Sequence, residues 1–397
     1  MEHKKSISLV LATALALTFV ISVFAFAPST PEPDNSIMDA MRADIGRIRL
    51  GIDAVGRSPE GKILGEYHNP DDVLTRNFAL MLAGWFTDDL TAGSVAMTGI
   101  NQTSGTLTNT EWAKAAGQGS AGQQVFLSDY DATVGAYLVV GNSTQAENKL
   151  DNKIISQVGA LQWFQNMTYN EDSGNITMVA TIIVDAPQTN GISESAIYYT
   201  TNAITWCIAR DNFAAIPVTL GDSITIQYTL QVGNTGFTKN FEKLLFGTLK
   251  RADVGEDQTQ IFTNTSGVEN TAYVHTDVST YVLFDVDIDT SGCDGIIVGT
   301  NNTAINRSSY GLGTPTTTQI SSNTAPLIVN GTTYSNITIA SNIVLGSSYS
   351  ITEAGWFCKN RDTAGTIFTM MLWRCVFSPY AYTANDVMTV SFVVRVG

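Results

Sequence analysis

The sequence predicts a mainly β protein with two tandem β-sandwich modules, of Ig-like or jelly-roll type, each opened by a short helix. A repeat is the first reason, because Arg374–Gly397 matches Arg210–Gly233 without a gap and is identical at seven positions. Alternation is the second reason. Apolar and polar residues alternate over residues 224–230 and 388–394, which is the period of a half-buried strand.

The repeat extends well beyond these strands and sets the domain boundaries. Residues 75–78 (Thr-Arg-Asn-Phe) match residues 238–241 (Thr-Lys-Asn-Phe), and all matching segments are separated by 158–164 residues. The other matches are 138–141 with 296–299, 175–177 with 336–338, and 192–194 with 351–353. We therefore expect module 1 at residues 70–233 and module 2, its internal repeat, at residues 234–397.

Residues 1–28 form a predicted membrane segment. Ile7–Ala27 is a run of 21 residues without a charge, and it spans about 30 Å as a helix, the thickness of a bilayer core. The run is either a transmembrane anchor or a cleaved signal peptide, since residues 25–27 (Ala-Phe-Ala) have the form of a cleavage site but Pro28 follows directly. Lysines before the run and acidic residues after it place the body outside the cytoplasm.

Residues 29–69 predict a Pro-rich spacer followed by an amphipathic, coiled-coil-like helix. Apolar residues in this region recur at alternating spacings of three and four, as in a heptad pattern. They are Met38, Met41, Ile45, Ile48, Ile52 and Val55. Such a helix either packs on the next module or forms a short oligomeric stalk, for which isoleucine at the core positions favours a trimer.

Each module is expected to open with a helix, at Val73–Phe86 and at Thr238–Leu249, where apolar residues recur at helical spacing before a glycine. Short strands follow, separated by Gly, Asn, Asp and Ser. The last two strands of each module are expected to form a hairpin, with turns at Leu220–Ser223 and Ala384–Val387.

Several short motifs resemble a module of structural and tail-fibre-type proteins of tailed bacteriophages. The motifs are clearest in module 2, at Ile351-Thr-Glu-Ala-Gly-Trp-Phe357, Met371-Leu-Trp-Arg-Cys-Val-Phe377 and Asp386-Val-Met-Thr389. The resemblance covers residues 70–397 and implies a non-catalytic module of surface fibres or virion decoration. The N-terminal membrane segment departs from that family, which favours a cell-surface protein or a virus with a membrane.

The chain is acidic, with Lys+Arg 21 against Asp+Glu 36 and a net charge of −15. This balance argues against nucleic acid and anionic lipid as partners. Alternating aspartates could form a solvated acidic face or, as the alternative, a Ca²⁺ site. They are Asp285, Asp287 and Asp289, together with Asp129 and Asp131 of the other module. No other cofactor is expected.

Charged and thiol residues of the strands have structural interpretations. Glu194 and Arg210 recur in module 2 as Glu353 and Arg374, which predicts one ion pair across neighbouring strands in each module. Cys358 and Cys375 lie in two arms of one predicted hairpin, and a disulfide between them is a candidate in an oxidising compartment. Only three histidines occur and no catalytic set assembles around them, so we do not expect an enzyme.

Trp163 and Phe164 have no clear counterpart in module 2, and this predicts an exposed aromatic site for a ligand such as a glycan. Nine Asn-x-Ser/Thr sequons are candidate glycosylation sites. They are Asn101, Asn142, Asn166, Asn175, Asn264, Asn301, Asn306, Asn330 and Asn336.

These observations favour an extracytoplasmic, membrane-anchored structural or adhesive surface protein that assembles into a fibre or spike. A virion spike or tail-fibre-like protein is the alternative, and a secreted glycan-binding protein is the third hypothesis. The expected partners are other copies of the chain as a trimer or filament, the membrane through residues 7–27, and a surface glycan or receptor. The expected location is the cell surface or the virion surface.

Overall fold

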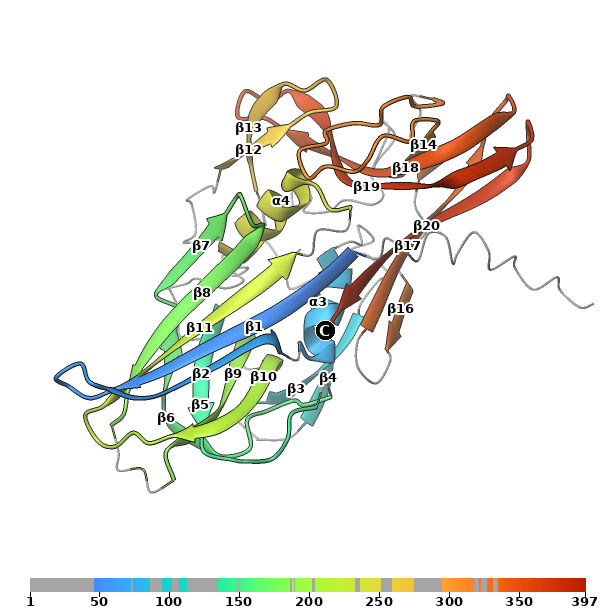
Figure 1. Cartoon of the computed structure of the whole chain (residues 1–397). Coiled ribbons are helices and arrows are strands. Elements are labelled where there is room, and N and C mark those ends of the chain that lie inside the picture. The colour runs from blue at the N-terminus through green and yellow to red at the C-terminus, as the bar shows by residue number, and fades with distance from the viewer. Residues whose placement is uncertain are drawn as a thin grey trace, which may run out of the picture. The chain divides into compact units, whose positions relative to one another are not determined.

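A computed structural model describes most of the chain after residue 45 (Figure 1). The described residues are 46–72, 74–85, 95–101, 107–112, 135–148, 150–185, 188, 190–201, 204–232, 236–250, 259–274, 295–317, 321–322, 327–330 and 335–397. The predicted anchor or signal segment lies outside them, as does the spacer up to residue 45. No helix among the described residues has both the length and the apolar composition that a membrane crossing requires.

The described chain is mainly β, as predicted, with two helices. In the first half the elements are β1 (Gly46–Arg57), β2 (Ile63–Asp72), α3 (Arg76–Trp85), β3 (Val95–Asn101), β4 (Leu107–Trp112), β5 (Gly135–Gly141), β6 (Gln157–Trp163), β7 (Asn166–Asn170), β8 (Asn175–Ile183), β9 (Ile192–Thr201), β10 (Ile204–Ile216) and β11 (Ser223–Val232). In the second half they are α4 (Lys239–Lys250), β12 (Thr259–Thr263), β13 (Glu269–Tyr273), β14 (Gly295–Gly299), β15 (Ser321–Ser322), β16 (Leu327–Asn330), β17 (Ser335–Val344), β18 (Tyr349–Arg361), β19 (Ile367–Tyr382) and β20 (Val387–Val396).

An eight-stranded sheet takes strands from both halves, in the order β16-β17-β20-β1-β11-β8-β7, with β2 paired to β1. β1 is antiparallel to β11 over residues 48–57 and parallel to β20 over residues 46–48. The last strands of the two halves, β11 and β20, are therefore joined through β1 (Figure 1). Residues 41–397 form one compact unit.

The helix predicted within residues 29–69 is wrong where the structure describes it, because β1 and β2 are strands. Ile48 and Ile52 fit a helical spacing of four, but they fit alternation equally well. Leu50 and Ala54 complete the alternating set, and all four side chains are at most 1% exposed. Glycines in the same stretch also disfavour a helix. They are Gly46, Gly51 and Gly56.

The remaining sheets place equivalent strands in the same order. β19, β18, β14 and β15 of the second half correspond to β10, β9, β5 and β6 of the first. In the first half a six-stranded sheet runs β4-β3-β10-β9-β5-β6. In the second half the corresponding strands form a four-stranded sheet, β15-β14-β18-β19, and a separate hairpin, β12-β13. Two isolated bridges connect this hairpin to the four-stranded sheet, Asn264 with Met370 of β19 and Ala272 with Asp362 directly after β18.

The closing hairpins predicted for each module are wrong. β10 pairs with β9 and β3, whereas β11 pairs with β8 and β1, so the turn between them carries the chain from one sheet to another. β19 and β20 are separated in the same way. The turns do use residues that tolerate a left-handed backbone, Gly221 (φ 90°) and Asn385 (φ 67°).

The Thr-x-Asn-Phe motif that opens each helix fastens the helix to a neighbouring strand. In the first half the Thr75 hydroxyl and the Asn77 amide both donate to the carbonyl of Cys207, at 2.7 and 3.1 Å. In the second half Thr238 and Asn240 donate to the carbonyl of Met371 in β19. Apolar residues of both helices then enter one large core cluster that draws on all four sheets.

Leu50 and Val55 give a direct test of the strand. In β1 the side chain of Leu50 is fully buried and that of Val55 is partly exposed. Leu50→Ala should therefore lower the free energy of unfolding by about 2–5 kcal/mol, and Val55→Ala should lower it clearly less. A heptad helix would place Val55 in the core and Leu50 outside it. The reverse ranking in urea unfolding would contradict the strand.

Candidate functional site

Two long loops are held to the sheets by buried carboxylates, and they form the candidate functional site. The first clamped loop, residues 142–148 and 150–156, joins β5 to β6; the second clamped loop, residues 300–317, follows β14. Glu194 of β9 is fully buried. Its Oε1 accepts a hydrogen bond from the backbone N–H of Ser156 at 2.8 Å, and its Oε2 accepts one from Ile155 at 3.2 Å.

Arg210 of β10 binds the same carboxylate, and we call Glu194 with Arg210 the first clamp. Its Nη2 lies 2.9 Å from Glu194 Oε2, and its Nη1 lies 2.7 Å from Asp151 Oδ2 in the loop. Nη2 also donates to the carbonyl of Gln145 at 2.9 Å. Burial on its own would lower the pKa of Arg210, but the hydrogen bonds to Asp151 and Glu194 outweigh it, and the pKa is raised. The guanidinium therefore stays charged.

The second half repeats the clamp. Glu353 of β18 is fully buried, and its Oε1 accepts from the N–H of Thr314 at 2.9 Å and its Oε2 from that of Gly313 at 3.2 Å. Arg374 of β19 places Nη2 2.8 Å from Glu353 Oε2. The structure thus brings together both Glu–Arg pairs that the sequence singled out, and it adds the loop N–H groups as partners.

A glycine at the end of β5 and of β14 makes room for each carboxylate. A Cβ on Gly141 would lie 2.5 Å from Glu194 Oε1, and a Cβ on Gly299 would lie 2.4 Å from Glu353 Oε1. Both distances are too short for any side chain, so only glycine fits. This close approach explains why the glycine recurs in both halves.

The hydrogen-bond acceptor positions of the clamp carboxylates are already occupied. Glu194 accepts from three backbone N–H groups, of Ser143, Ile155 and Ser156, and from two nitrogens of Arg210. A carboxylate has about four lone-pair positions, so its acceptor capacity is filled. The arrangement fixes loops on a β framework and does not present an acid or base to a substrate.

A third buried carboxylate connects the two halves. Glu242 of α4 binds Arg307 of the second clamped loop, with Arg307 Nε 2.8 Å from Glu242 Oε1. Arg307 also donates to the carbonyls of Glu171 and Asp172, in the turn between β7 and β8. Tyr169 of β7 donates to Glu242 Oε2 at 2.8 Å. Burial and the neighbouring Glu242 raise the pKa of Tyr169, which therefore remains a donor.

The aromatic site predicted at Trp163 and Phe164 is wrong for Phe164, which is 4% exposed. The chain crosses from β6 to β7, in another sheet, at this residue, so the ring enters the core and lies edge-on to Tyr228. Trp163 is half-buried, with its ring edge-on to Tyr137 at 5.4 Å between centroids.

The disulfide predicted between Cys358 and Cys375 is wrong. The register of β18 and β19 places Cys358 opposite Met370 and Cys375 opposite Ala354. The two cysteines are thus about four residues apart along the hairpin, or ~13 Å, which is beyond the reach of a disulfide. Both remain buried thiols.

The aspartates of the calcium hypothesis lie outside the described residues. They are Asp129, Asp131, Asp285, Asp287 and Asp289. Within the described part of the chain, no group of three His, Cys, Asp or Glu side chains is placed to hold a metal ion.

The candidate glycosylation sites of described exposure are exposed or partly exposed. They are Asn142, Asn166, Asn175, Asn264, Asn301, Asn306 and Asn336. The remaining two, Asn101 and Asn330, are the last residues of β3 and β16.

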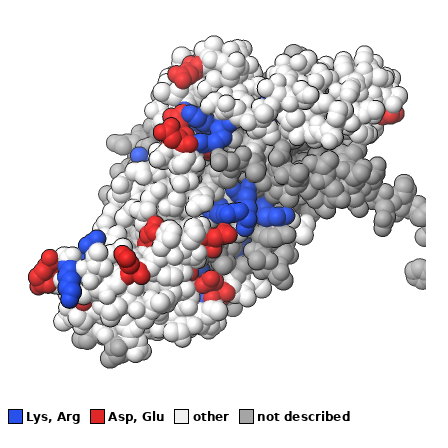
Figure 2. Space-filling view, viewed as in Figure 1, with Lys and Arg blue, Asp and Glu red and all other residues white. Residues whose placement is uncertain are grey.

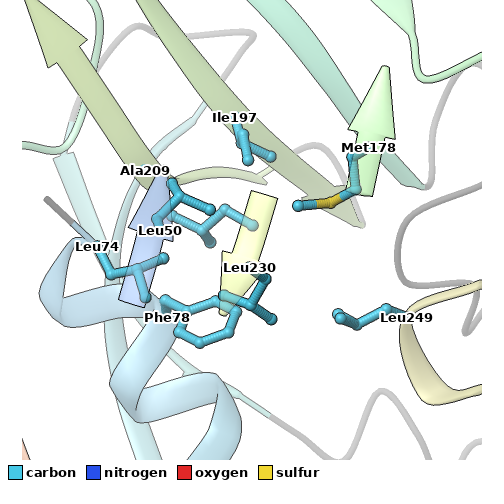
Figure 3. Close-up of a pocket in the computed structure, with 9 residues that line it drawn as sticks. Leu50, Leu74, Phe78, Met178, Ile197, Ala209, Leu230 and Leu249 are labelled. Carbon is cyan, nitrogen blue, oxygen red and sulfur yellow. The ribbon is translucent and has the colours of Figure 1, made fainter. Parts of the chain in front are cut away.

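A small apolar cavity lies in the core between β1, β11 and α3 (Figure 3). Its volume is about 10 Å³, and Leu50, Phe78, Leu230 and Leu249 are among the side chains that line it. The volume corresponds to about one water molecule, and an apolar lining offers water no partner. The cavity is a packing gap and is too small for a ligand.

Comparison with known proteins adds no relative, since no family model, curated protein or solved structure matches this chain. Nothing in these comparisons links it to tail-fibre proteins.

Glu353→Gln tests the clamp. The substitution removes the charge that balances the buried Arg374, so it should lower the free energy of unfolding by about 3–5 kcal/mol. The second clamped loop, which contains Arg307, should also become susceptible to cleavage in limited proteolysis. Glu171→Gln is the control, because it removes an exposed pair with Lys239 (3.1 Å) and should cost at most about 1 kcal/mol. Equal losses in the two variants would contradict the clamp.

Glu171 also gives a pH-dependent signal of known sign. Its hydrogen bond with Lys239 and the nearby Lys243 hold its pKa below the ordinary value. The stabilisation is therefore present above the unfolded-state pKa of about 4.3 and is lost as the pH falls through the lower folded-state pKa. Wild-type and Glu171→Gln protein should differ at pH 7 and converge near pH 3. A difference that grows on acidification would contradict this assignment.

Proposed function

We propose that the chain is an extracytoplasmic, membrane-anchored structural or adhesive surface protein, built from a duplicated β-sandwich module that displays clamped loops. The observation that carries the proposal is the repetition of the clamp. Glu194 with Arg210, and Glu353 with Arg374, recur in the two halves, and each pair binds loop backbone and not a solvent-open pocket. A duplicated module whose shared polar residues fix loops suits display.

The apolar run at Ile7–Ala27 supports attachment to a membrane, with the lysines before it on the cytoplasmic side. Self-association into a fibre or spike is part of the proposal. Val344, the last residue of β17, and Val387, the first residue of β20, are cross-strand partners and are 56% and 68% exposed. Ile183 is 69% exposed at the corresponding end of β8. We infer that a second copy covers the exposed Val344–Val387 pair.

A virion spike or tail-fibre-like protein is the second candidate. The motifs at residues 351–357 and 371–377 support it through their resemblance to tail-fibre-type modules. Both candidates present the fold at a surface, which is the surface of a cell in the first and of a virus particle in the second.

An epitope tag after Gly397 tests the proposal in the organism that makes the protein. We expect antibody to label the tag on intact cells and the protein to sediment with membranes. Leu15→Arg, which places a charge at the centre of the apolar run and costs about 2.5–3.5 kcal/mol of insertion free energy, should abolish that sedimentation. Leu15→Ile should not.

If the antibody reaches the tag only after cell lysis, the proposal is contradicted. Label on released particles that contain nucleic acid, with none on cells, would replace it with the virion candidate. Negative-stain electron microscopy of the purified protein should show fibres or spikes, and uniform monomers would remove self-association from the proposal.

A further inference from the structure

His68 and Asp53 form a hydrogen-bonded pair on the outer face of the eight-stranded sheet. His68 of β2 is the cross-strand partner of Asp53 of β1, and its Nδ1 bonds Asp53 Oδ1. Gln227 of β11 approaches from the other side, with Nε2 3.4 Å from Asp53 Oδ2. An ionised carboxylate only accepts hydrogen bonds, so the proton of the neutral imidazole is on Nδ1. The lone pair of the ring is therefore on Nε2.

This second ring nitrogen is open to solvent. His68 keeps 69% of its side-chain surface exposed, and Asp53 is the one partner that the described part of the chain gives it. Figure 2 shows that described residues form the surface over the middle of β1 and β11, which lie in front in Figure 1. A dissolved ion can therefore reach Nε2.

Glu66 places a second ligand group beside His68. β2 pairs with β1 without a register shift from Glu66 to His68, so the two side chains lie on the same face, with Cα atoms about 7 Å apart. Glu66 is exposed, and no hydrogen bond or ion pair occupies its carboxylate within the described chain. Ligand atoms around a tetrahedral zinc ion are ~3.3 Å apart, and the rotatable bonds of both side chains allow that approach.

The local charge favours a cation. Asp53 and Glu66 carry two negative charges, and no Lys or Arg side chain described by the structure forms an ion pair with either. Arg57, on the same face of β1, donates to the carbonyl of Gly61 instead. The net charge of −15 also raises the concentration of cations around the protein.

The ligand types identify the class of cation. Imidazole nitrogen suits zinc, copper and nickel, whereas calcium and magnesium prefer oxygen ligands. A histidine that binds a metal nearly always donates its other ring N–H to a carboxylate or carbonyl, which fixes the ring. Asp53 already accepts that bond from His68. The pair therefore has the tautomer and the support that a metal ligand requires.

One chain supplies two ligands, whereas a closed zinc site takes four. No group of three metal-binding side chains is present among the residues that the structure describes, so the missing ligands must come from elsewhere. Among the described strands β2 pairs with β1 alone. A second copy related by a two-fold axis would bring the same two ligands to the same ion.

We propose that Glu66 and His68 form one half of a zinc site that joins two copies of the chain. The partner's His68 and the partner's Glu66 complete the four ligands, and Asp53 is a positioning residue in each copy. This inference rests on the self-association included in the proposed function and names one contact that produces it. The membrane location is tested separately by the epitope tag, so failure of the zinc site would leave that location untouched.

The test measures the mass of purified full-length protein by sedimentation, with Zn²⁺, with Mg²⁺ and with a chelator, and the zinc stoichiometry by calorimetry. We expect zinc to double the mass with one ion bound per two chains, and Mg²⁺ to leave the mass unchanged. His68→Gln and Glu66→Gln should each raise the zinc concentration needed for pairing by about tenfold or more. Asp53→Asn should raise it by about 10–100-fold.

Two control variants should pair within about twofold of the wild-type zinc concentration. Glu60→Gln removes an exposed carboxylate from the β1–β2 turn, where it bonds Ser58. His3→Gln removes an imidazole that precedes the apolar run. All variants should melt at the wild-type temperature in chelator, because a metal site contributes no stability without the metal.

A zinc-dependent mass that is equal in wild type and His68→Gln, or no zinc-dependent mass at all, would overturn the proposal. One zinc per chain at unchanged mass would overturn the shared site, and an equal response to Mg²⁺ would overturn the role of the imidazole. If His68→Gln does not fold, Glu66→Gln carries the same comparison with Glu60→Gln.

Discussion

The cost of burying a carboxylate is the constraint on which the rest of the structure depends. Glu194 and Glu353 are fully buried within sheets, where an unpaired charge would cost several kcal/mol. Each half meets that cost in the same way, with loop N–H groups on one side and a guanidinium from the neighbouring strand on the other. The two clamped loops are therefore part of the fold, because moving either one would leave a buried charge without its donors.

β1 applies a second constraint, which concerns the relation between the halves. It pairs with β11 along almost its whole length and with β20 at its start, so the halves share one sheet. Arg307 and Glu242 make a further contact, between α4, the second clamped loop and the β7–β8 turn. Duplication alone would give two separate modules. The unrepeated strand and the unrepeated Arg307–Glu242 contact are what make residues 41–397 one unit.

The sequence could predict what is repeated or strictly periodic. Alternation predicted the β class, and the Thr-x-Asn-Phe motif marked both helices within a few residues of their ends. β1 was missed because Ile48 and Ile52 satisfy two periods at once, so a short window cannot separate helix from strand. Arg307 was missed because its partner Glu242 is 65 positions away in the chain and neither residue is repeated. Only the three-dimensional fold brings such a pair together.

The polar residues that are repeated in both halves therefore have structural roles. A residue present in both halves is explained by folding, as the clamps and their glycines show. β1 occurs once, so repetition does not explain its pairing with both β11 and β20.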